Sequence, residues 1–247
     1  NLDDLIKTAQ HYGYKGIEFR VEWGHNHGLE LDATDHDLKQ ANHKLKDAGV
    51  EASCIATSVK FNSPERAVHL SQRETLKRYI RLASLVGAPL IRTFSDSLPE
   101  DDPASRDQVI NLAAESYTVV DAIAQDYGIT VLVETHTNMK GQWVRQILDA
   151  SSADNLQVLW HIGHHLQRGQ SVDEAYSYIR GRVQHVHFTA TEDAYVKDSD
   201  NQRSFDLLAA EGYAGYFSVE IINPDNPQAV LAHHINKYRQ FMQALAQ

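Results

Sequence analysis

The stretch NLQVLWHIGH (155–164) joins a short apolar run to a histidine-rich turn. Three further segments repeat this arrangement, a β-like run with a Glu or His at or near its end: ITVLVETH (129–136), RVQHVHF (182–188) and GYFSVEI (215–221). In a parallel barrel the carboxyl ends of the strands converge on one mouth. We therefore expect four metal-competent side chains to meet around one point: Glu134, His161, His187 and Glu220.

Helical periodicity alternates with strand periodicity along the whole chain, and glycines commonly stand where a helix gives way to a strand. The expected strands cover 15–21, 50–57, 89–94, 129–135, 156–160, 182–188 and 216–221. The expected helices cover 2–14, 35–49, 73–88, 105–128, 143–151, 172–181, 202–213 and 227–245. Repeated helix–strand units of this kind predict a parallel sheet with crossover helices.

The predicted fold is an α/β fold, a (β/α)8 TIM barrel, with residues 1–247 as one domain. Such barrels use about 250 residues, which fits this length. The pattern contains seven strands and opens on a helix, so we expect the first strand to lie upstream of residue 1. An incomplete seven-stranded barrel is less favoured, because its opening helix would lie beside an unpaired sheet edge. Loops at 22–34, 57–72, 95–104 and 189–201 each follow a strand, on the face where barrels place active sites.

Composition excludes several classes of protein. The net charge of −10 opposes a broad nucleic-acid interface, which needs a basic face. No apolar run approaches the roughly 20 residues of a membrane span. Cys54 is the single cysteine, so no intrachain disulfide can form and a reducing, cytoplasmic location is expected. The sequence has no dinucleotide or Walker glycine motif and no GxSxG elbow.

Glu134 and Glu220 stand inside apolar runs, where a carboxylate is costly to bury unless it is paired or binds a metal. For one such Glu alone, a salt bridge to a neighbouring helix is an equally good interpretation. His187 lies nearer the mouth than His185, which we expect to be an interior histidine. His161 ends its strand, and His164 opens the following loop.

Three more polar residues lie at or near strand ends: Glu18, Arg92 and His136. Each is expected to hydrogen-bond a polyol substrate; for Glu18 and Arg92, pairing with the other charge is the alternative. Six other histidines lie in polar or helical stretches and are expected to be solvated: His11, His36, His43, His69, His233 and His234.

Five segments together resemble the sugar phosphate isomerase/epimerase family of the xylose isomerase-like TIM barrel superfamily: GYKGIEFR (13–20), VLVETH (131–136), HIGH (161–164), VQHVHF (183–188) and GYAGYFSVEI (212–221). The resemblance covers nearly the whole chain. It implies one divalent metal ion held by Glu134, His161, His187 and Glu220. It also implies that Glu134 and Glu220 are the catalytic acid/base pair and that His164 lies near the substrate.

The implied reaction is proton transfer by Glu on a keto-sugar or keto-polyol, through a metal-stabilised enediolate. Isomerisation, epimerisation and dehydration (of a keto-inositol, for example) share this first step, and we expect an isomerase or epimerase. The family usually has Asp where this chain has His161. Two Glu and two His favour Mn²⁺, Co²⁺, Fe²⁺ or Zn²⁺ over Mg²⁺.

Two alternative functions compete with this interpretation. An endonuclease IV-like metal phosphodiesterase would need extra histidine ligands from earlier strands, and SCIATS (53–58) and IRTFSD (91–96) contain none. A catalytically silent sugar-binding barrel is favoured by the departure at His161. The expected partner is a small-molecule sugar or polyol, with no nucleic acid and no membrane, and homo-oligomerisation is left open.

Overall fold

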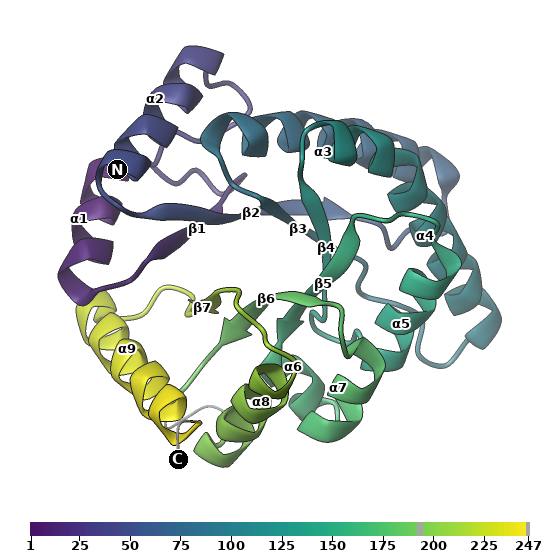
Figure 1. Ribbon diagram of the computed structural model, residues 1–247. Helices are drawn as coiled ribbons and strands as arrows, with labels where there is room; N and C mark the ends of the chain where they lie inside the picture. The colour runs from purple at the N-terminus through teal and green to yellow at the C-terminus, as the bar shows by residue number, and fades with distance from the viewer. Residues whose placement is uncertain (192–194, 246–247) are drawn as a thin grey trace.

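The computed structural model describes residues 1–191 and 195–245. Seven parallel strands curve into an incomplete barrel with the helices on its outside, which confirms the predicted α/β TIM-barrel fold (Figure 1). The strands are β1 Gly16–Arg20, β2 Glu51–Lys60, β3 Leu90–Phe94, β4 Thr130–Glu134, β5 Leu156–His161, β6 Val183–Phe188 and β7 Phe217–Val219. The helices are α1 Leu2–Tyr12, α2 Asp35–Asp47, α3 Arg66–Val86, α4 Pro103–Asp126, α5 Gly141–Ala150, α6 Ile162–Gln167, α7 Val172–Ile179, α8 Asp198–Ala210 and α9 Pro227–Ala244.

The period of two along each strand sorts side chains between two environments. In β4, Val131 and Val133 pack in the large core between strands and helices, whereas Leu132 belongs to a separate small cluster. Cys54 of β2 and Leu159 of β5 complete that cluster with Leu132. The next residue on the same face as Leu132 is Glu134, at the end of β4. The barrel interior therefore changes from apolar to charged towards the carboxyl ends of the strands.

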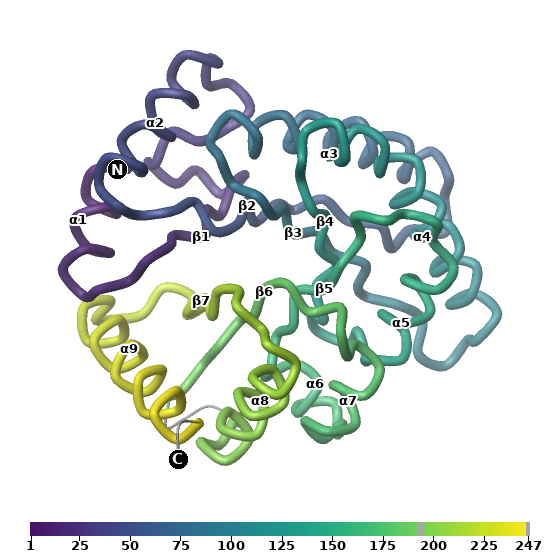
Figure 2. The backbone as a smooth tube through the Cα atoms, viewed as in Figure 1, coloured from purple at the N-terminus to yellow at the C-terminus, as the bar shows by residue number. Residues whose placement is uncertain are grey.

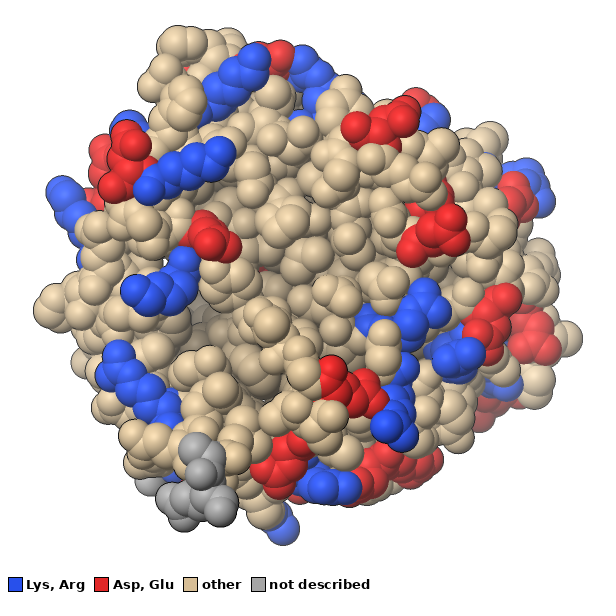
Figure 3. Space-filling view, in the orientation of Figure 1, with Lys and Arg blue, Asp and Glu red and all other residues tan. Residues whose placement is uncertain are grey.

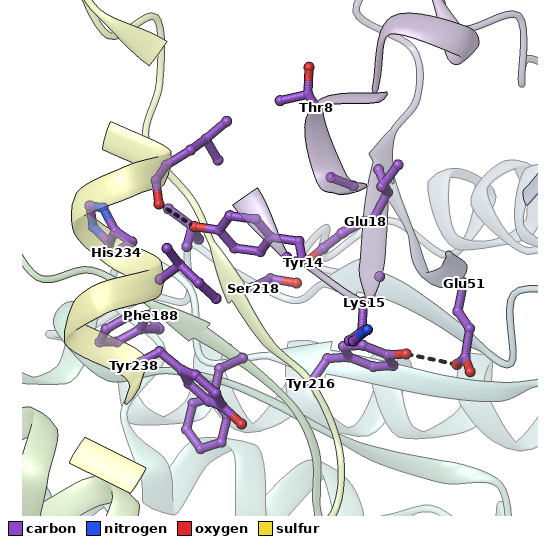
Figure 4. Close-up of a pocket in the computed structure, with 18 of the residues that line it drawn as sticks. Thr8, Tyr14, Lys15, Glu18, Glu51, Phe188, Tyr216, Ser218, His234 and Tyr238 are labelled. Atoms are coloured by element: carbon purple, nitrogen blue, oxygen red, sulfur yellow. Dashed lines mark hydrogen bonds between the residues drawn. The ribbon is translucent and has the colours of Figure 1, made fainter. Parts of the chain in front are cut away.

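Each strand pairs with the next along the chain, from β1 to β7, but within the described residues β1 does not pair with β7. The open seam between them is visible beside α1 and α9 (Figure 2). A cavity of about 720 Å³ lies there, lined by residues of α1, β1, β7 and α9 (Figure 4). An eighth strand of a closed barrel would occupy this position. A strand upstream of residue 1 stays a prediction.

Two tyrosines bridge the seam. The Tyr216 hydroxyl donates to Glu51 Oε2 at 2.8 Å, and the Tyr14 hydroxyl donates to the Leu231 carbonyl at 2.9 Å (Figure 4). The Tyr216 ring lies so close to Gly16 that a Cβ there would come within 2.7 Å of a ring carbon. Glycine at position 16 thus lets the side chain cross the edge of β1.

The predicted start of the third helix and the bounds of two predicted loops were wrong. The helix expected at 73–88 begins at Arg66, and β2 continues to Lys60, so most of the loop expected at 57–72 is regular structure. The first turns of α3 bury His69 and Arg73 and expose Val68 and Leu70, the reverse of the usual pattern. In the loop expected at 189–201, α8 begins at Asp198, and residues 192–194 lie outside the described residues.

Two of the histidines expected to be solvated are buried. His69 Nδ1 lies 2.8 Å from Ser116 Oγ, and its Nε2 lies 2.8 Å from the Ser63 carbonyl. His234 Nε2 accepts the Ala190 backbone N–H at 3.1 Å. These rings are buried because they satisfy backbone and hydroxyl groups between helices and loops, which a polar sequence context does not reveal.

Candidate metal and active site

Four side chains converge at the mouth as the strand ends predict. Glu134 and His161 are the last residues of β4 and β5, His187 lies one residue before the end of β6, and Glu220 directly follows β7. One ligand atom of each lies within 4.8 Å of those of the other three. The Glu134 side chain is fully buried and that of His187 is 2% exposed, whereas that of Glu220 is 35% exposed. The group therefore runs from the barrel interior towards solvent.

His187 occupies the centre of this group. Its Nδ1 lies 3.0 Å from Glu220 Oε2 and 3.2 Å from Glu134 Oε1, while its Nε2 lies 3.0 Å from Glu18 Oε1. Burial disfavours the charged imidazole, but Glu220, Glu18 and Glu134 outweigh it and raise the pKa of His187 well above its ordinary value. His187 therefore faces a carboxylate from each of three different segments, Glu18, Glu134 and Glu220.

Glu18 lies behind His187 rather than at the open mouth. Its Oε2 is 2.9 Å from His185 Nε2, which also lies 2.8 Å from Ser218 Oγ. Burial raises the pKa of Glu18, but His187 and His185 lower it well below its ordinary value. A carboxylate behind a histidine fixes the tautomer and orientation of a metal-binding ring. The contacts of Glu18 therefore support an orienting role, and its predicted contact with substrate stays a prediction.

Arg92 and Glu134 form a buried ion pair, with Arg92 Nη1 2.7 Å from Glu134 Oε2. Burial favours the neutral acid, but Arg92 and then His187 lower the pKa of Glu134. Arg92 also lies over the Phe94 ring, 4.0 Å from its centroid. The alternative in which Arg92 pairs with a carboxylate is thus present in the structure, although the partner is Glu134 and not Glu18.

His161 does two things at the end of β5. Its Nδ1 accepts the backbone N–H groups of Gly163 and His164, at 3.2 and 3.3 Å, and so caps the short helix α6. Its Nε2 lies 3.4 Å from Glu220 Oε2. A neutral imidazole has one lone pair, so a ring that accepts at Nδ1 carries its proton on Nε2. His161 thus presents a donor to Glu220 in this arrangement.

His136 and His164 extend the cluster beyond His161. The His164 ring stacks on that of His161 with centroids 3.8 Å apart, and the rings of His136 and His164 meet edge to face with centroids 4.8 Å apart. His164 lies in the first turn of α6, where a loop was predicted. Burial, together with His161 and His136, lowers the pKa of His164 to about 3, so this ring is neutral.

Asp96 was not predicted as part of the site. Its Oδ2 lies 3.0 Å from His136 Nδ1 and accepts the Thr137 hydroxyl at 2.8 Å. Asp96 follows β3 by two residues within a polar loop, so no strand periodicity marks it. The one available signal was its place in a loop after a strand, which many polar residues share.

The fold and the mouth define a parallel α/β barrel with a centre of buried carboxylates and histidines. The chain belongs to the xylose isomerase-like TIM barrel family, whose model matches residues 6–241. No functionally curated protein matches the sequence.

Several solved structures share the fold. L-ribulose 3-epimerase has a TM-score of 0.79 and 17% identity, over 99% of this chain and 90% of that chain. The 3-keto-D-glucoside 4-epimerase YcjR from E. coli has a TM-score of 0.77 and 15% identity, over 98% and 94%. The IolI protein with a zinc atom bound has a TM-score of 0.77 and 15% identity, over 99% and 92%. At these identities the likeness establishes the fold.

The distribution of charged side chains on the surface agrees with the acidic composition. On the face shown in Figure 3, Lys and Arg side chains are interspersed with Asp and Glu around the rim and form no continuous basic patch. Among the described residues, no helix is both long enough and apolar enough to span a bilayer.

Proposed function

We propose that the protein is a divalent-metal-dependent isomerase or epimerase of a keto-sugar or keto-polyol. The observation that carries this proposal is the convergence of Glu134, His161, His187 and Glu220 on one point at the barrel mouth. The sugar epimerases among the structural neighbours support the substrate class. The zinc atom in one neighbour supports a metal-dependent site.

The side chains fit a metal ion at three of the four positions. Glu134 Oε1 and His187 Nδ1 are buried and make no hydrogen bond of good geometry with any described residue, although they face each other. Glu220 Oε2 completes this set, 3.0 Å from His187 Nδ1. His161 fits less well, because binding through Nε2 would require its proton on Nδ1 and would break the cap of α6. Imidazole and carboxylate donors favour Mn²⁺, Co²⁺, Fe²⁺ or Zn²⁺, and we propose one such ion.

Glu134 and Glu220 are the proposed acid/base pair. Both are held as carboxylates although burial opposes it, since Arg92 and His187 lower the pKa of Glu134 and His187 and His161 lower that of Glu220, and a carboxylate can accept a proton. They come from β4 and from the end of β7, so a substrate between them would meet one carboxylate from each strand. One Glu removes the proton on the carbon next to the carbonyl, and the other returns a proton. A divalent ion bound beside them would stabilise negative charge that develops on the substrate oxygen.

His136 and His164 are proposed to face the substrate, because both lie at the mouth beside Glu134. Arg92 keeps Glu134 ionised through their 2.7 Å contact, and Glu18 holds His187 in orientation. Dehydration of a keto-polyol begins with the same proton removal and remains a variant of this proposal.

The test is exchange of the substrate proton with solvent. Protein loaded with Mn²⁺ or Co²⁺ is incubated with a panel of ketoses and keto-polyols in deuterated water, and NMR follows deuterium incorporation next to the carbonyl. We expect incorporation by the wild type and a loss of about 10²-fold or more in Glu134→Gln and Glu220→Gln. Glu115→Gln is the matched control, since Glu115 pairs with Arg66 and Arg73 away from the mouth.

A catalytically silent sugar-binding barrel is the second candidate, favoured by the helix cap that His161 makes through Nδ1. Metal and ketose binding without deuterium incorporation by the wild type would establish it and would refute the isomerase proposal.

A further inference from the structure

We propose that Arg20 is a specificity-determining residue that binds a carboxylate substituent of the substrate, which makes the substrate a keto-sugar acid. The inference deepens the proposed function and rests on it, because the carboxylate is bound at the same barrel mouth. It concerns the part of the mouth formed by β1 and β2, whereas the four metal-competent side chains come from the ends of β4 to β7.

Arg20 points into the barrel at its mouth. It is the last residue of β1 and stands two residues after Glu18, which contacts His187 inside the barrel. Side chains two apart on a strand share a face, so Arg20 lies on the inner face, nearer the mouth than Glu18. Burial and then the charge of Arg92 lower the pKa of Arg20. The guanidinium, which stays charged, therefore lies within the electrostatic field of the candidate site.

The guanidinium is held in place but not neutralised. Its Nη1 donates to the carbonyls of Val21 and Ala56 at 2.7 and 2.9 Å, and its Nη2 donates to Ser58 Oγ at 2.7 Å. All three partners are uncharged, and no carboxylate of the described residues forms an ion pair with Arg20. The nearest carboxylate along the chain, that of Glu22, accepts the Ser58 backbone N–H instead. A partly buried cation without a counter-ion is costly, and an anionic ligand would remove that cost.

The free donors of Arg20 match a carboxylate. A guanidinium has five N–H groups, and three of them are used, which leaves one on Nε and one on Nη2. Two adjacent donors of this kind can bind both oxygens of a carboxylate. The Trp23 ring covers one face of the guanidinium, with its centroid 4.4 Å from the central carbon, so the ligand approaches in the guanidinium plane. Because Glu134 and Glu220 already lie at the mouth, a singly charged carboxylate is repelled less than a doubly charged phosphate.

Lys60 adds a second cation on this side of the mouth. It pairs with Phe94 of β3 in the strand register, and its Nζ lies 5.4 Å from the centroid of that ring. Its side chain is 40% exposed, and its contact with Asp96 Oδ2 is long, at 3.9 Å. Lys60 therefore attracts an anion through its charge, whereas Arg20 fixes the orientation of the anion.

Binding of matched ketohexoses tests the proposal without catalysis. Each D-ketohexose is titrated by calorimetry into Mn²⁺-loaded protein as the free sugar, as the acid oxidised at carbon 6 and as the 6-phosphate. We expect at least one acid to bind about 10- to 100-fold more tightly than its parent sugar, and Arg20→Gln to remove that difference. Arg20→Lys keeps the charge without the paired donors and should keep only part of the difference.

Two further variants control for folding and for loss of charge. Lys60→Met leaves the hydrogen bonds of Arg20 intact and should weaken binding of the acid about two- to fivefold without changing that of the parent sugar. Arg145→Gln is the matched control, since Arg145 pairs with Asp149 on α5, and it should bind both compounds as the wild type does. Thermal melting of each variant establishes that it is folded.

The outcomes separate this subsite from the proposed function. Acids that bind no better than their parent sugars, or whose advantage persists in folded Arg20→Gln, would overturn the subsite. A preference for the 6-phosphates over the acids would overturn the assignment to a carboxylate. Binding of an acid that depends on Arg20, without deuterium incorporation next to its carbonyl, would support the subsite and refute the isomerase proposal. Deuterium incorporation into a neutral ketose at a rate that Arg20→Gln leaves unchanged, with no tighter binding of the acids, would do the reverse.

Discussion

At position 161, a histidine and an aspartate would differ in how well they can bind a metal ion. An aspartate has two oxygens, so one can cap a helix while the other binds a cation. A neutral imidazole has a single lone pair, and in this structure the lone pair of Nδ1 accepts hydrogen bonds from the backbone of α6. In His161, capping of α6 and metal binding thus compete for one lone pair, whereas a carboxylate could do both.

This competition predicts that His161→Asp tightens metal binding at the site formed with Glu134, His187 and Glu220. Freeing the ligand from two hydrogen bonds of about 1 kcal/mol each gives a gain of about ten- to thirtyfold in affinity. Metal titration monitored by calorimetry measures it. His161→Asn is the matched control: it can cap α6 but adds no charge, and its affinity should not rise. Equal affinities of the Asp variant and the wild type would refute the argument.

Arg92 and Glu134 carry a second prediction at this scale. Arg92→Met leaves the fully buried carboxylate without its 2.7 Å partner and should lower the free energy of unfolding by about 3–5 kcal/mol. The double variant Arg92→Met/Glu134→Gln removes both charges and should lose less. Urea unfolding of the metal-free proteins measures both. A double variant as unstable as the single one would contradict the expected coupling.

The strand-end side chains were predictable because alternation along a strand is a local signal. Glu134 and His187 lie on the inner face of their strands at the mouth, where the sequence places them. Their partners were not predictable in the same way. Glu18 reaches His187 across a separation of 169 residues, and the position of Asp96 depends on a loop conformation. The sequence pattern indicates which face of a strand a residue occupies, whereas its partners depend on how the folded barrel brings distant segments together.

At the scale of elements, the sequence pattern worked where helices bury an apolar face and failed where they do not. The start of α3 was missed because its first turns bury His69 and Arg73, each bonded to Ser116 Oγ of α4. Helix α6 was missed because its six residues are too short for periodicity and rest on the cap from His161. Both cases need tertiary partners that a local pattern lacks.

The contact of α5 with α7 gives a prediction for elements. Gly141 opens α5, and a Cβ there would stand 2.7 Å from the Ala175 carbonyl oxygen of α7. Gly141→Ala should therefore push the helices apart and destabilise the protein by about 1–3 kcal/mol. Gly128→Ala is the comparison, because its Cβ would meet nothing within 4 Å and its cost is the left-handed backbone alone, at φ +65°. That cost is about 1 kcal/mol. Chemical denaturation compares the two, and a smaller loss at Gly141 would contradict the steric argument.

At the scale of the whole molecule, the seam makes stability uneven around the barrel. Strand β4 pairs on both sides, with β3 and β5, whereas β1 and β7 each pair with one neighbour in the described structure. Strand β7 has three residues, none fully buried, and it borders the cavity of about 720 Å³. Local opening is easiest where backbone hydrogen bonds are few and apolar contacts sparse. Amide hydrogen exchange of this chain should therefore be slowest in β3, β4 and β5 and fastest in β7, with β1 between them.

The two tyrosine bridges refine this expectation. Tyr216→Phe removes the bond to Glu51 and keeps the ring against Gly16, so exchange should quicken in β1 and β7 but not in β4. Tyr178→Phe, on α7 and away from the seam, serves as the control. Uniform protection across the seven strands would show that side chains crossing the seam already join its edges into one cooperative unit. In that case β7 and β4 would unfold together, because both cover the same hydrophobic core. The open edge would then reduce the number of strand pairings without making β7 a separate unfolding unit.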